Sequence, residues 1–364
     1  MTALGIGIGF VGGGFMAEVH SRAARSAGAR LVGIVSSSPA RSASAAESLG
    51  FETAYDSVEQ LLADPAVDVV HIVTPNATHH DFALAAIRAG KHVVCEKPLT
   101  TSVADAAELV AAAASAGVVA TVPFAYRFHP MVREARARLA SGGPGRLVSI
   151  QGVYLQDWLL DRSDDNWRVD QGTGGPSRAF ADIGSHLVDL IEFVAGDRIS
   201  RVQALTRTVH AERASTKAVT TEDLAAVLFE TGEGAVGTLL VSQVAPGRKN
   251  RLHLELSGAN ESVVFDQENP ESLWLGRRAG SEILTRGEGL APDAARLSIL
   301  PAGHPLGFQD AFNAFVADSY AAIAGDAPDG LPTFDDGLRA VHLTEAVIES
   351  ASTGAWVETI GTTA

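Results

Sequence analysis

Short apolar runs alternate with amphipathic, alanine-rich segments over the first third of the chain. The apolar runs predict strands at residues 4–11, 31–35, 67–74, 92–96 and 118–123. Helices are predicted at 81–89 and 102–116, each followed directly by a glycine, Gly90 or Gly117, the residue type that commonly ends a helix. Strands that alternate with helices form a parallel sheet with right-handed crossovers. Residues 1–123 are therefore predicted to form one α/β domain.

The pattern changes in the remainder of the chain. Strand-like runs follow one another with few helices between them, at residues 147–154, 199–209, 225–229, 234–243, 251–257 and 262–267. Helices are predicted at 183–195, 310–324 and 335–352. Residues 279–305 lack a clear period and are predicted to form a long loop. Successive strands indicate a mainly antiparallel sheet, so residues 124–364 are predicted to form an α+β domain.

Composition agrees with this organisation and restricts the class of partner. The chain has 364 residues, more than one hydrophobic core usually serves, and 46% of them are hydrophobic. Its net charge of −15 argues against binding to nucleic acid or to an anionic membrane, because both need a basic patch. Neither a secretory leader pattern nor an apolar segment of membrane-spanning length is present, so a cytoplasmic protein is expected. The single cysteine, Cys95, lies in an apolar run and is expected to be a packed core thiol.

A glycine-rich turn follows the first predicted strand. The run Gly12-Gly13-Gly14-Phe15-Met16-Ala17 has the pattern G-x-G-x-x-A, in which Gly12 makes a tight turn and Gly14 lets the backbone approach a pyrophosphate. The helix that begins there would direct its first N–H groups at the phosphates. A glycine turn without a ligand is the alternative. The strand at 31–35 favours the ligand, because it ends where a dinucleotide-binding fold contacts the adenosine ribose.

The residue after that second strand indicates which cofactor is bound. Ser36 stands where an Asp or Glu would accept hydrogen bonds from the ribose 2′-hydroxyl of NAD and repel a 2′-phosphate. Ser36, Ser37 and Ser38 offer neutral donors instead, and Arg41 offers a cation. We therefore predict that NADP is preferred, with NAD as a possible cofactor. The alternative is that the serines cap a helix that begins near Pro39, and the two roles are compatible.

Polar residues gather at the predicted carboxyl ends of the strands, where parallel α/β sheets bind their ligands. Besides the glycine turn and Ser36, these are Thr74-Pro75-Asn76, Glu96-Lys97-Pro98 and Phe124-Ala125-Tyr126-Arg127. Lys97 is predicted to face the nicotinamide, to hydrogen-bond the reacting oxygen and to stabilise alkoxide character on it.

Asp182 and His186 are four residues apart at the start of a predicted helix, so their side chains share one face. Oxidation of a secondary alcohol needs a proton acceptor as the hydride leaves. Since imidazole titrates near neutrality, His186 is the better acceptor, and Asp182 would orient it or bind a neighbouring hydroxyl. Taken singly, a Lys-Pro pair is typical of a turn, and an Asp-His pair is typical of surface hydrogen bonding. The presence of both pairs in one chain, in the expected order, favours hydride transfer. Whether Lys97 or His186 is the formal base stays open.

Together these motifs resemble those of the glucose-fructose oxidoreductase, inositol dehydrogenase and MocA (Gfo/Idh/MocA) family. The resemblance covers about residues 5–357 and is carried by Gly12-x-Gly14, Thr74-Pro75-Asn76, Glu96-Lys97-Pro98, Tyr126-Arg127-Phe128-x-Pro130 and Asp182-Ile183-Gly184-Ser185-His186. It implies a Rossmann domain, a second domain with a large open antiparallel sheet, and NAD(P)-dependent chemistry on a sugar, sugar derivative or cyclitol. Family members often bury the sheet against another subunit, so a homodimer or homotetramer is expected.

The resemblance and the residue chemistry together assign the site. Lys97, Asp182 and His186 are the predicted catalytic residues. The predicted cofactor-binding residues are Gly12, Gly14, Phe15, Met16, Ser36, Ser37, Arg41, Thr74, Pro75, Asn76, His79, Glu96, Lys97, Arg127, Trp167 and Arg168. The predicted substrate-binding residues are Lys97, Tyr126, Asp157, Trp158, Arg168, Asp182 and His186.

Two stretches narrow the resemblance further. Leu155-Gln156-Asp157-Trp158 looks like the corresponding stretch of levoglucosan dehydrogenases and related glycoside 3-dehydrogenases, in which an indole face would pack on a sugar ring. Trp158 and Trp167 could equally fill core space. The spacing Ser36-x-Ser38-x-x-Arg41 instead looks like that of the NADP-type 1,5-anhydrofructose reductases.

Three alternatives accompany this interpretation. An inositol or cyclitol dehydrogenase would use the same motifs. A non-catalytic dinucleotide-binding sensor or scaffold is the alternative from another class, although the presence of Lys97 and His186 argues against it. A metal site built on Asp182, His186 and Asp189, with His79 or His80 as a further ligand, is disfavoured because no further ligands are spaced to complete the coordination sphere. No metal is therefore predicted.

Overall fold

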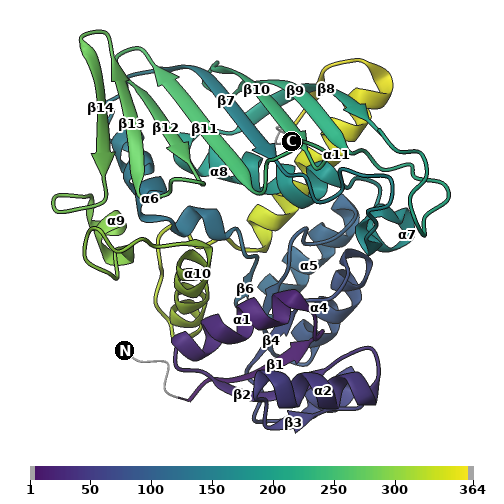
Figure 1. The fold of residues 1–364 in the computed structure, drawn as a ribbon. Helices are drawn as coiled ribbons and strands as arrows, with labels where there is room; N and C mark the ends of the chain where they lie inside the picture. The colour runs from purple at the N-terminus through teal and green to yellow at the C-terminus, as the bar shows by residue number, and fades with distance from the viewer. Residues whose placement is uncertain (1–4, 360–364) are drawn as a thin grey trace. The chain divides into compact units, whose positions relative to one another are not determined.

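The computed structural model describes residues 5–359 and divides them into two compact units. The first unit contains residues 5–125 and 308–341, and the second contains residues 126–307 and 342–359. Each unit has its own sheet (Figure 1).

The first unit is built on a six-stranded sheet in which all neighbouring strands are parallel. Its strands are β1 (Gly7–Val11), β2 (Arg30–Val35), β3 (Thr53–Ala54), β4 (Val69–Ile72), β5 (His92–Cys95) and β6 (Ala120–Thr121), in the spatial order β3-β2-β1-β4-β5-β6. Every residue of β1 and of β4 is buried, as expected of strands covered on both faces. The 3-2-1-4-5-6 order is that of the dinucleotide-binding fold, so the predicted α/β class is confirmed.

Helices connect these strands, and serine side chains define where three of them begin. They are α1 (Phe15–Ser26), α2 (Pro39–Leu49), α3 (Val58–Ala63), α4 (His79–Arg88) and α5 (Val103–Ala116). The hydroxyls of Ser38, Ser57 and Ser102 accept hydrogen bonds from backbone N–H groups in the first turns of α2, α3 and α5. α5 ends at Gly117, which has a left-handed conformation at φ 65°.

Residues 308–341 return to the first unit after the whole second sheet has been formed. They include α10 (Phe308–Ile323), which lies beside α1 in Figure 1, and the first part of α11 (Phe334–Thr353). The Gln309 amide donates to the carbonyl of Val19 on α1 at 3.1 Å. The predicted division into 1–123 and 124–364 did not include this return, because the periodicity of a helix does not show which sheet the helix covers.

The second unit contains a nine-stranded sheet in the order β14-β13-β12-β11-β7-β10-β9-β8-β15. Its strands are β7 (Leu147–Leu155), β8 (Ile199–Arg207), β9 (Leu224–Thr231), β10 (Val236–Ser242), β11 (Arg251–Gly258), β12 (Ser262–Asp266), β13 (Ser272–Arg277), β14 (Gly280–Thr285) and β15 (Val357–Glu358). All neighbours are antiparallel except β10 and β7, which are parallel. The expected mainly antiparallel sheet is therefore confirmed, as a mixed one.

Only one face of this sheet is covered by helices of the same unit. α6 (Pro130–Ala140) packs on β12 and β13, and α8 (Ser185–Ala195) packs on β7 and β11, both on the same face in Figure 1. Burial alternates along β9 and β10, as expected when one face packs on a core and the other does not. The uncovered face carries exposed apolar side chains, including Leu205, Leu228 and Leu240.

Residues 279–305 are not the continuous loop that was predicted. They contain the whole edge strand β14 and the short helix α9 (Pro292–Leu297). Five of the six residues of β14 are exposed, so the strand lacks the alternation by which half-buried strands are identified. The predicted strand at 4–11 begins at Gly7, and residue 4 lies outside the described residues.

Candidate active site

The glycine-rich turn has the geometry that close approach of a phosphate requires. Gly12 has φ 109°, and a Cβ atom on it would lie 2.7 Å from the carbonyl oxygen of Val73. Gly14 is the N-cap of α1 without a side-chain hydrogen bond, and a Cβ there would point into open space. Phe15 is largely exposed at the first position of the helix. A pyrophosphate therefore fits here, at an open N-terminus of a 12-residue helix.

The structure shows the capping role of the serines after β2 and places them near the glycine turn. Ser38 caps α2, since its hydroxyl accepts from Arg41 N–H at 3.3 Å, which confirms the helix start near Pro39. The guanidinium of Arg41 donates to the Ser37 hydroxyl at 3.1 Å, and both residues are exposed. A Cβ atom on Gly13 would lie 3.4 Å from the hydroxyl of Ser36, so that hydroxyl is adjacent to the glycine turn.

The segment after β4 forms a short 3₁₀ turn at Asn76–Thr78 that leads into α4. His79 is fully buried between two carbonyl oxygens, with Nδ1 2.8 Å from Pro98 O and Nε2 2.9 Å from Thr74 O. The pKa of His79 lies below its ordinary value, because the lowering by burial is larger than the raising by these carbonyls and the Glu96 carboxylate. His79 thus links the loops after β4 and β5, which carry the predicted residues Thr74 to Asn76 and Glu96 to Pro98.

Lys97 lies directly after the buried strand β5. Its backbone N–H donates to Oε2 of Glu96 at 3.1 Å, and the bond that follows, Lys97–Pro98, is a cis peptide. Glu96 is buried, and burial alone would raise the pKa of its carboxyl group. His20, Lys97 and His79 together hold that pKa below its ordinary value, so the carboxylate is ionised. Cys95 is buried beside it, where burial raises the pKa of the thiol, as expected of a core cysteine.

Asp182 and His186 lie at the start of the long helical segment of the second unit. Residues Phe180–Gly184 form a π-helical turn that continues directly into α8, so the helix begins three residues before the predicted position. Such turns are uncommon and occur often at functional sites. Asp182 receives a hydrogen bond from the buried Gln243 amide at 2.8 Å and an ion pair from Arg168 at 3.3 Å. Its carboxylate is therefore oriented from two other segments.

A row of hydrogen-bonded polar side chains lies next to His186. The rings of Tyr126 and His186 pack edge to face with their centroids 5.2 Å apart. The Tyr126 hydroxyl lies 2.6 Å from that of Tyr154, and both hydroxyls bind the Asn250 amide. Gln156 continues the row, because its amide donates to the same Asn250 oxygen at 2.9 Å. The predicted substrate residues Tyr126, Asp182 and His186 are thus brought into one neighbourhood of this unit.

Two further predicted substrate residues, Asp157 and Trp158, lie at the end of this row. The indole N–H of Trp158 donates to the Gln156 carbonyl at 2.8 Å, and the ring is about one-third exposed. Asp157 binds the ammonium group of Lys249 at 2.8 Å, and this bond lowers the pKa of its carboxyl group. Trp158 is therefore not a core residue, which removes one of the two interpretations that its sequence allowed.

Trp167 and Arg168 form a 3₁₀ turn at Trp167–Val169, with the Arg168 guanidinium 4.3 Å above the indole ring. Arg127, another predicted cofactor residue, is buried and forms a two-bond ion pair with Asp189. Asp189, considered above as a metal ligand, is engaged in that pair. Within residues 5–359, the structure places no three His, Cys, Asp or Glu side chains together as a metal-binding group.

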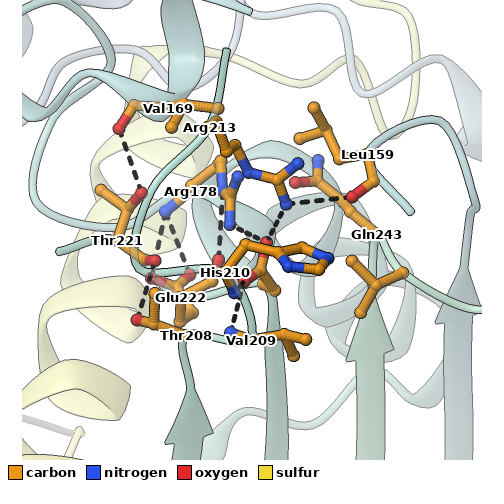
Figure 2. Close-up of polar contacts among 12 residues, drawn as sticks. Leu159, Val169, Arg178, Thr208, Val209, His210, Arg213, Thr221, Glu222 and Gln243 are labelled. Atoms are coloured by element: carbon orange, nitrogen blue, oxygen red, sulfur yellow. Dashed lines mark hydrogen bonds and ion pairs between the residues drawn. The ribbon is translucent and has the colours of Figure 1, made fainter. Parts of the chain in front are cut away.

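A buried charge cluster, here called the Asp223 cluster, comprises Arg178, Arg213, Glu222 and Asp223. Figure 2 labels Arg178, Arg213 and Glu222 of this cluster. Asp223 Oδ1 accepts from Arg178 and, at 2.6 Å, from Arg213. Oδ2 accepts from Val209 N–H at 2.6 Å. Burial alone raises the pKa of Asp223, but its bonds to both arginines bring the pKa below its ordinary value. The carboxylate is consequently ionised inside the unit.

The Asp223 cluster holds two of the segments that carry predicted substrate residues. Arg213 donates to the carbonyls of Leu159, Asp161 and Asp164, at 2.9 to 3.0 Å, and so fixes the loop between Trp158 and Arg168. Glu222 accepts from Ser177, from the backbone N–H of Arg178 and from the N–H of Phe180, two residues before Asp182. The cluster is thus the shared support of the loop and of the π-helical turn.

Several of these residues were not identified from the sequence. They are Tyr154, Arg178, Arg213, Glu222, Asp223, Gln243 and Asn250. Gln243 had a usable signal, because it directly follows β10 and polar residues at strand ends had been selected elsewhere. Arg213 and Asp223 had no such signal, because nothing in the sequence around them shows that their charges form a pair in the folded protein.

Comparison with known proteins agrees with this geometry. Residues 6–124 match an oxidoreductase family with an NAD-binding Rossmann fold, and residues 132–264 match the Gfo/Idh/MocA C-terminal domain. Levoglucosan dehydrogenase from Pseudarthrobacter phenanthrenivorans is 30% identical over 97% of this chain and 98% of its own. The chain belongs to the Gfo/Idh/MocA oxidoreductase family.

Two further members of this family are similar over most of their length. The 1,5-anhydro-D-fructose reductase of Ensifer adhaerens is 30% identical over 91% of this chain and 92% of its own. A solved structure of levoglucosan dehydrogenase with NADH and levoglucosan has a TM-score of 0.91 at 31% identity, covering 97% of this chain and 98% of the other. The predicted family, NAD-binding fold and oxidoreductase class are confirmed. No helix within residues 5–359 is long and apolar enough to cross a membrane.

Replacement of Arg213 tests the support that the Asp223 cluster provides. In Arg213→Met, Asp223 loses one of its two guanidinium partners. The carbonyls of Leu159, Asp161 and Asp164 lose a hydrogen-bond donor. We expect the free energy of unfolding to fall by about 3–5 kcal/mol, because a buried carboxylate loses a partner. Chemical denaturation measures the loss, and amide hydrogen exchange in residues 159–168 is expected to accelerate.

Arg162→Met is the matched control for this prediction. Arg162 is in the same loop, but its side chain is 69% exposed and its ion pair is with Glu212 on the surface. Exposed pairs contribute little, so this variant should unfold like the unaltered protein. Equal stability of the Arg213 and Arg162 variants would show that the cluster does not support the loop.

Proposed function

We propose that this oxidoreductase transfers a hydride between a nicotinamide cofactor, preferably NADP, and a secondary alcohol or ketone of a sugar, glycoside or anhydrosugar. Two similar relatives are named for anhydrosugar substrates, levoglucosan and 1,5-anhydrofructose. The observation that carries the proposal is the arrangement around Asp182, where Gln243 and Arg168 fix a carboxylate on a π-helical turn one helical turn before His186.

The bound cofactor supplies the hydride acceptor in the oxidative direction. The open N-terminus of α1 would hold its pyrophosphate. Lys97 would bind the substrate oxygen and stabilise negative charge on it, and His186 would accept the hydroxyl proton. Asp182, which lies 3.3 Å from the Arg168 guanidinium, would stabilise the imidazolium that results.

The remaining polar residues would bind the other hydroxyl groups of the substrate. The row from Tyr126 through Asn250 and Gln156 to Trp158 presents alternating donors and acceptors, which suits a polyol. The part-exposed indole of Trp158 is available to pack on the C–H face of a ring. An inositol would satisfy the same groups, so a substrate panel must contain anhydrosugars, glycosides and inositols. The cytoplasmic location stays a prediction from the sequence.

Incubation with NADP or NAD and this panel, followed by absorbance of the reduced nicotinamide, tests the proposal directly. Turnover of at least one polyol is expected. Cofactor binding without turnover of any member would instead support a dinucleotide-binding sensor.

Ser36→Asp is expected to reverse the cofactor preference. A carboxylate beside the glycine turn would face the 2′-phosphate of NADP, and repulsion there costs on the order of 1 kcal/mol or more, about a tenfold change in the ratio of kcat/KM values. Ser48→Asp is the matched control, because it adds the same charge at an exposed position near the other end of α2. Better use of NAD than of NADP by the unaltered protein would contradict the preference.

His186→Asn tests the proposed base. If His186 accepts the proton, kcat/KM for oxidation rises with pH as the imidazole becomes neutral, and the variant loses this limb and about two to four orders of magnitude in rate. Asp182→Asn should move the limb to lower pH, since the imidazolium loses a negative neighbour. His80→Asn, at a surface histidine paired with Asp81 and Glu108, should keep both rate and profile. A folded His186→Asn enzyme with normal kinetics would remove His186 from the mechanism.

The uncovered face of the nine-stranded sheet supports the expected homodimer or homotetramer. Leu205, Leu228, Val236 and Leu240 are 73%, 46%, 53% and 40% exposed on β8, β9 and β10, and apolar groups on such a face mark interaction sites. The double variant Leu205→Glu/Leu228→Glu is expected to lower the mass measured by light scattering. Ile299→Glu, at a 63% exposed position outside the sheet, should leave that mass unchanged. A monomeric unaltered protein would contradict the proposal.

A further inference from the structure

Four buried side chains of the first unit form one continuous chain of hydrogen bonds that ends beside Lys97. The Tyr320 hydroxyl lies 2.8 Å from His71 Nε2, and His71 Nδ1 lies 2.8 Å from His20 Nδ1. His20 Nε2 lies 2.9 Å from Glu96 Oε1. The other oxygen of Glu96 accepts from the backbone N–H of Lys97 at 3.1 Å. All four side chains are at least nine-tenths buried, so water does not supply alternative partners.

The hydrogen-bonding capacity of each group restricts the direction of this chain. An ionised Glu96 can only accept, so His20 donates through Nε2. Burial holds the pKa of His71 well below its ordinary value, so His71 carries a single N–H. In the form in which His20 also carries a single N–H, its Nδ1 accepts from His71 Nδ1, and His71 Nε2 accepts from Tyr320. Each bond then points toward Glu96.

Aromatic rings surround the two histidines of the chain. The rings of Phe10 and Phe312 pack on the two histidines, with centroids 4.8 Å from His71 and 4.6 Å from His20 respectively. The charged or titratable groups that act on Glu96 are His20 from α1, Lys97 beside it and His79 from α4. Hydrogen bonds aligned in one direction polarise one another in such a low-dielectric interior. Their common end is the Glu96 carboxylate.

We propose that His20, His71 and Tyr320 are positioning residues for Lys97, since they fix the Glu96 carboxylate in its ionised form and hold it against the Lys97 backbone. This inference rests on the catalytic role of Lys97 in the proposed function. Apolar side chains of similar size would fill the same space without the cost of burying polar groups. What the polar chain adds is a defined charge and orientation at Glu96.

Nitrogen-15 NMR of the unaltered protein tests the direction of the chain without reference to activity. At neutral pH we expect His20 to carry its proton on Nε2 and His71 to carry its proton on Nδ1. Both imidazoles should show a second, unprotonated nitrogen. Protonation of both nitrogens of His20 at neutral pH would overturn the directed chain.

Substitution of His20 tests the consequence for Glu96. In His20→Leu the carboxylate loses its donor and stays buried, so its pKa should rise toward neutrality. An infrared carbonyl band of a protonated carboxyl group is therefore expected at mildly acidic pH, and the additional change Glu96→Gln should remove it. Because activity needs the ionised form, the acid limb of the kcat profile should move to higher pH, with kcat lowered about tenfold.

Conservative variants separate this role from a structural one. His20→Gln keeps an N–H near the position of Nε2 and should restore both kcat and the acid limb. Tyr320→Phe keeps the ring and removes only the hydroxyl that donates to His71. It should move the acid limb of the kcat profile to higher pH by a smaller amount than His20→Leu does. Tyr55→Phe is the matched control, because it removes a tyrosine hydroxyl bound to Asp64 elsewhere in the same unit. Loss of thermal stability in His20→Leu and Tyr320→Phe with unchanged kcat and acid limb would overturn the proposal.

Lys97→Met separates failure of this inference from failure of the proposed function. If Lys97→Met turns over normally, the proposed role of Lys97 is wrong, while the NMR and infrared results still determine whether the chain controls Glu96. If Lys97→Met is inactive and His20→Leu shows no protonated carboxyl group, the proposed function stands and the positioning role is wrong.

Discussion

The constraint on which the second unit depends is that a buried carboxylate must keep its donors. Asp223 is fully buried, and its charge is tolerated because two guanidinium groups and backbone N–H groups converge on it. The two arginines belong to different segments. Arg213 binds three carbonyls of the loop after Trp158, and Arg178 lies two residues before the π-helical turn of Asp182. Because Asp223 needs both arginines to balance the cost of its burial, its ion pairs fix two segments at once. Movement of either segment would take a guanidinium away from the buried carboxylate.

The first unit meets the same requirement by another means. Glu96 is also buried beside a proposed catalytic residue, but its partner is an imidazole rather than a guanidinium. A guanidinium is charged at every relevant pH, whereas an imidazole is a neutral donor with an acceptor on its other side. Asp223 is thus held by a fixed charge pair suited to rigid support. In the directed form that we propose, Glu96 is held by a chain without a second buried cation, and Lys97 is the cation beside it.

The predictions from sequence were accurate where local pattern decides the structure. Apolar runs located β2, β7 and β11 to within one or two residues, and the cap at Ser38 and the glycine after α5 were correct, because each depends on neighbours in the chain. Contacts between distant residues were not accessible. The attachment of residues 308–341 to the first unit, the parallel pairing of β10 with β7 and the exposed edge strand β14 all depend on packing partners far away in sequence.

The site shows the same division at the level of single residues. Asp182 and His186 could be selected because a spacing of four is a local property, and the π-helical turn refined that spacing without changing the pair. Gln243 lies 61 residues from Asp182, yet it donates to the same carboxylate that Arg168 reaches from the other direction. The position of Gln243 directly after β10 is a local signal, but its partner is determined only when the fold brings it to Asp182. The local motif therefore selects the groups that we propose to react, while the long-range hydrogen bonds orient them.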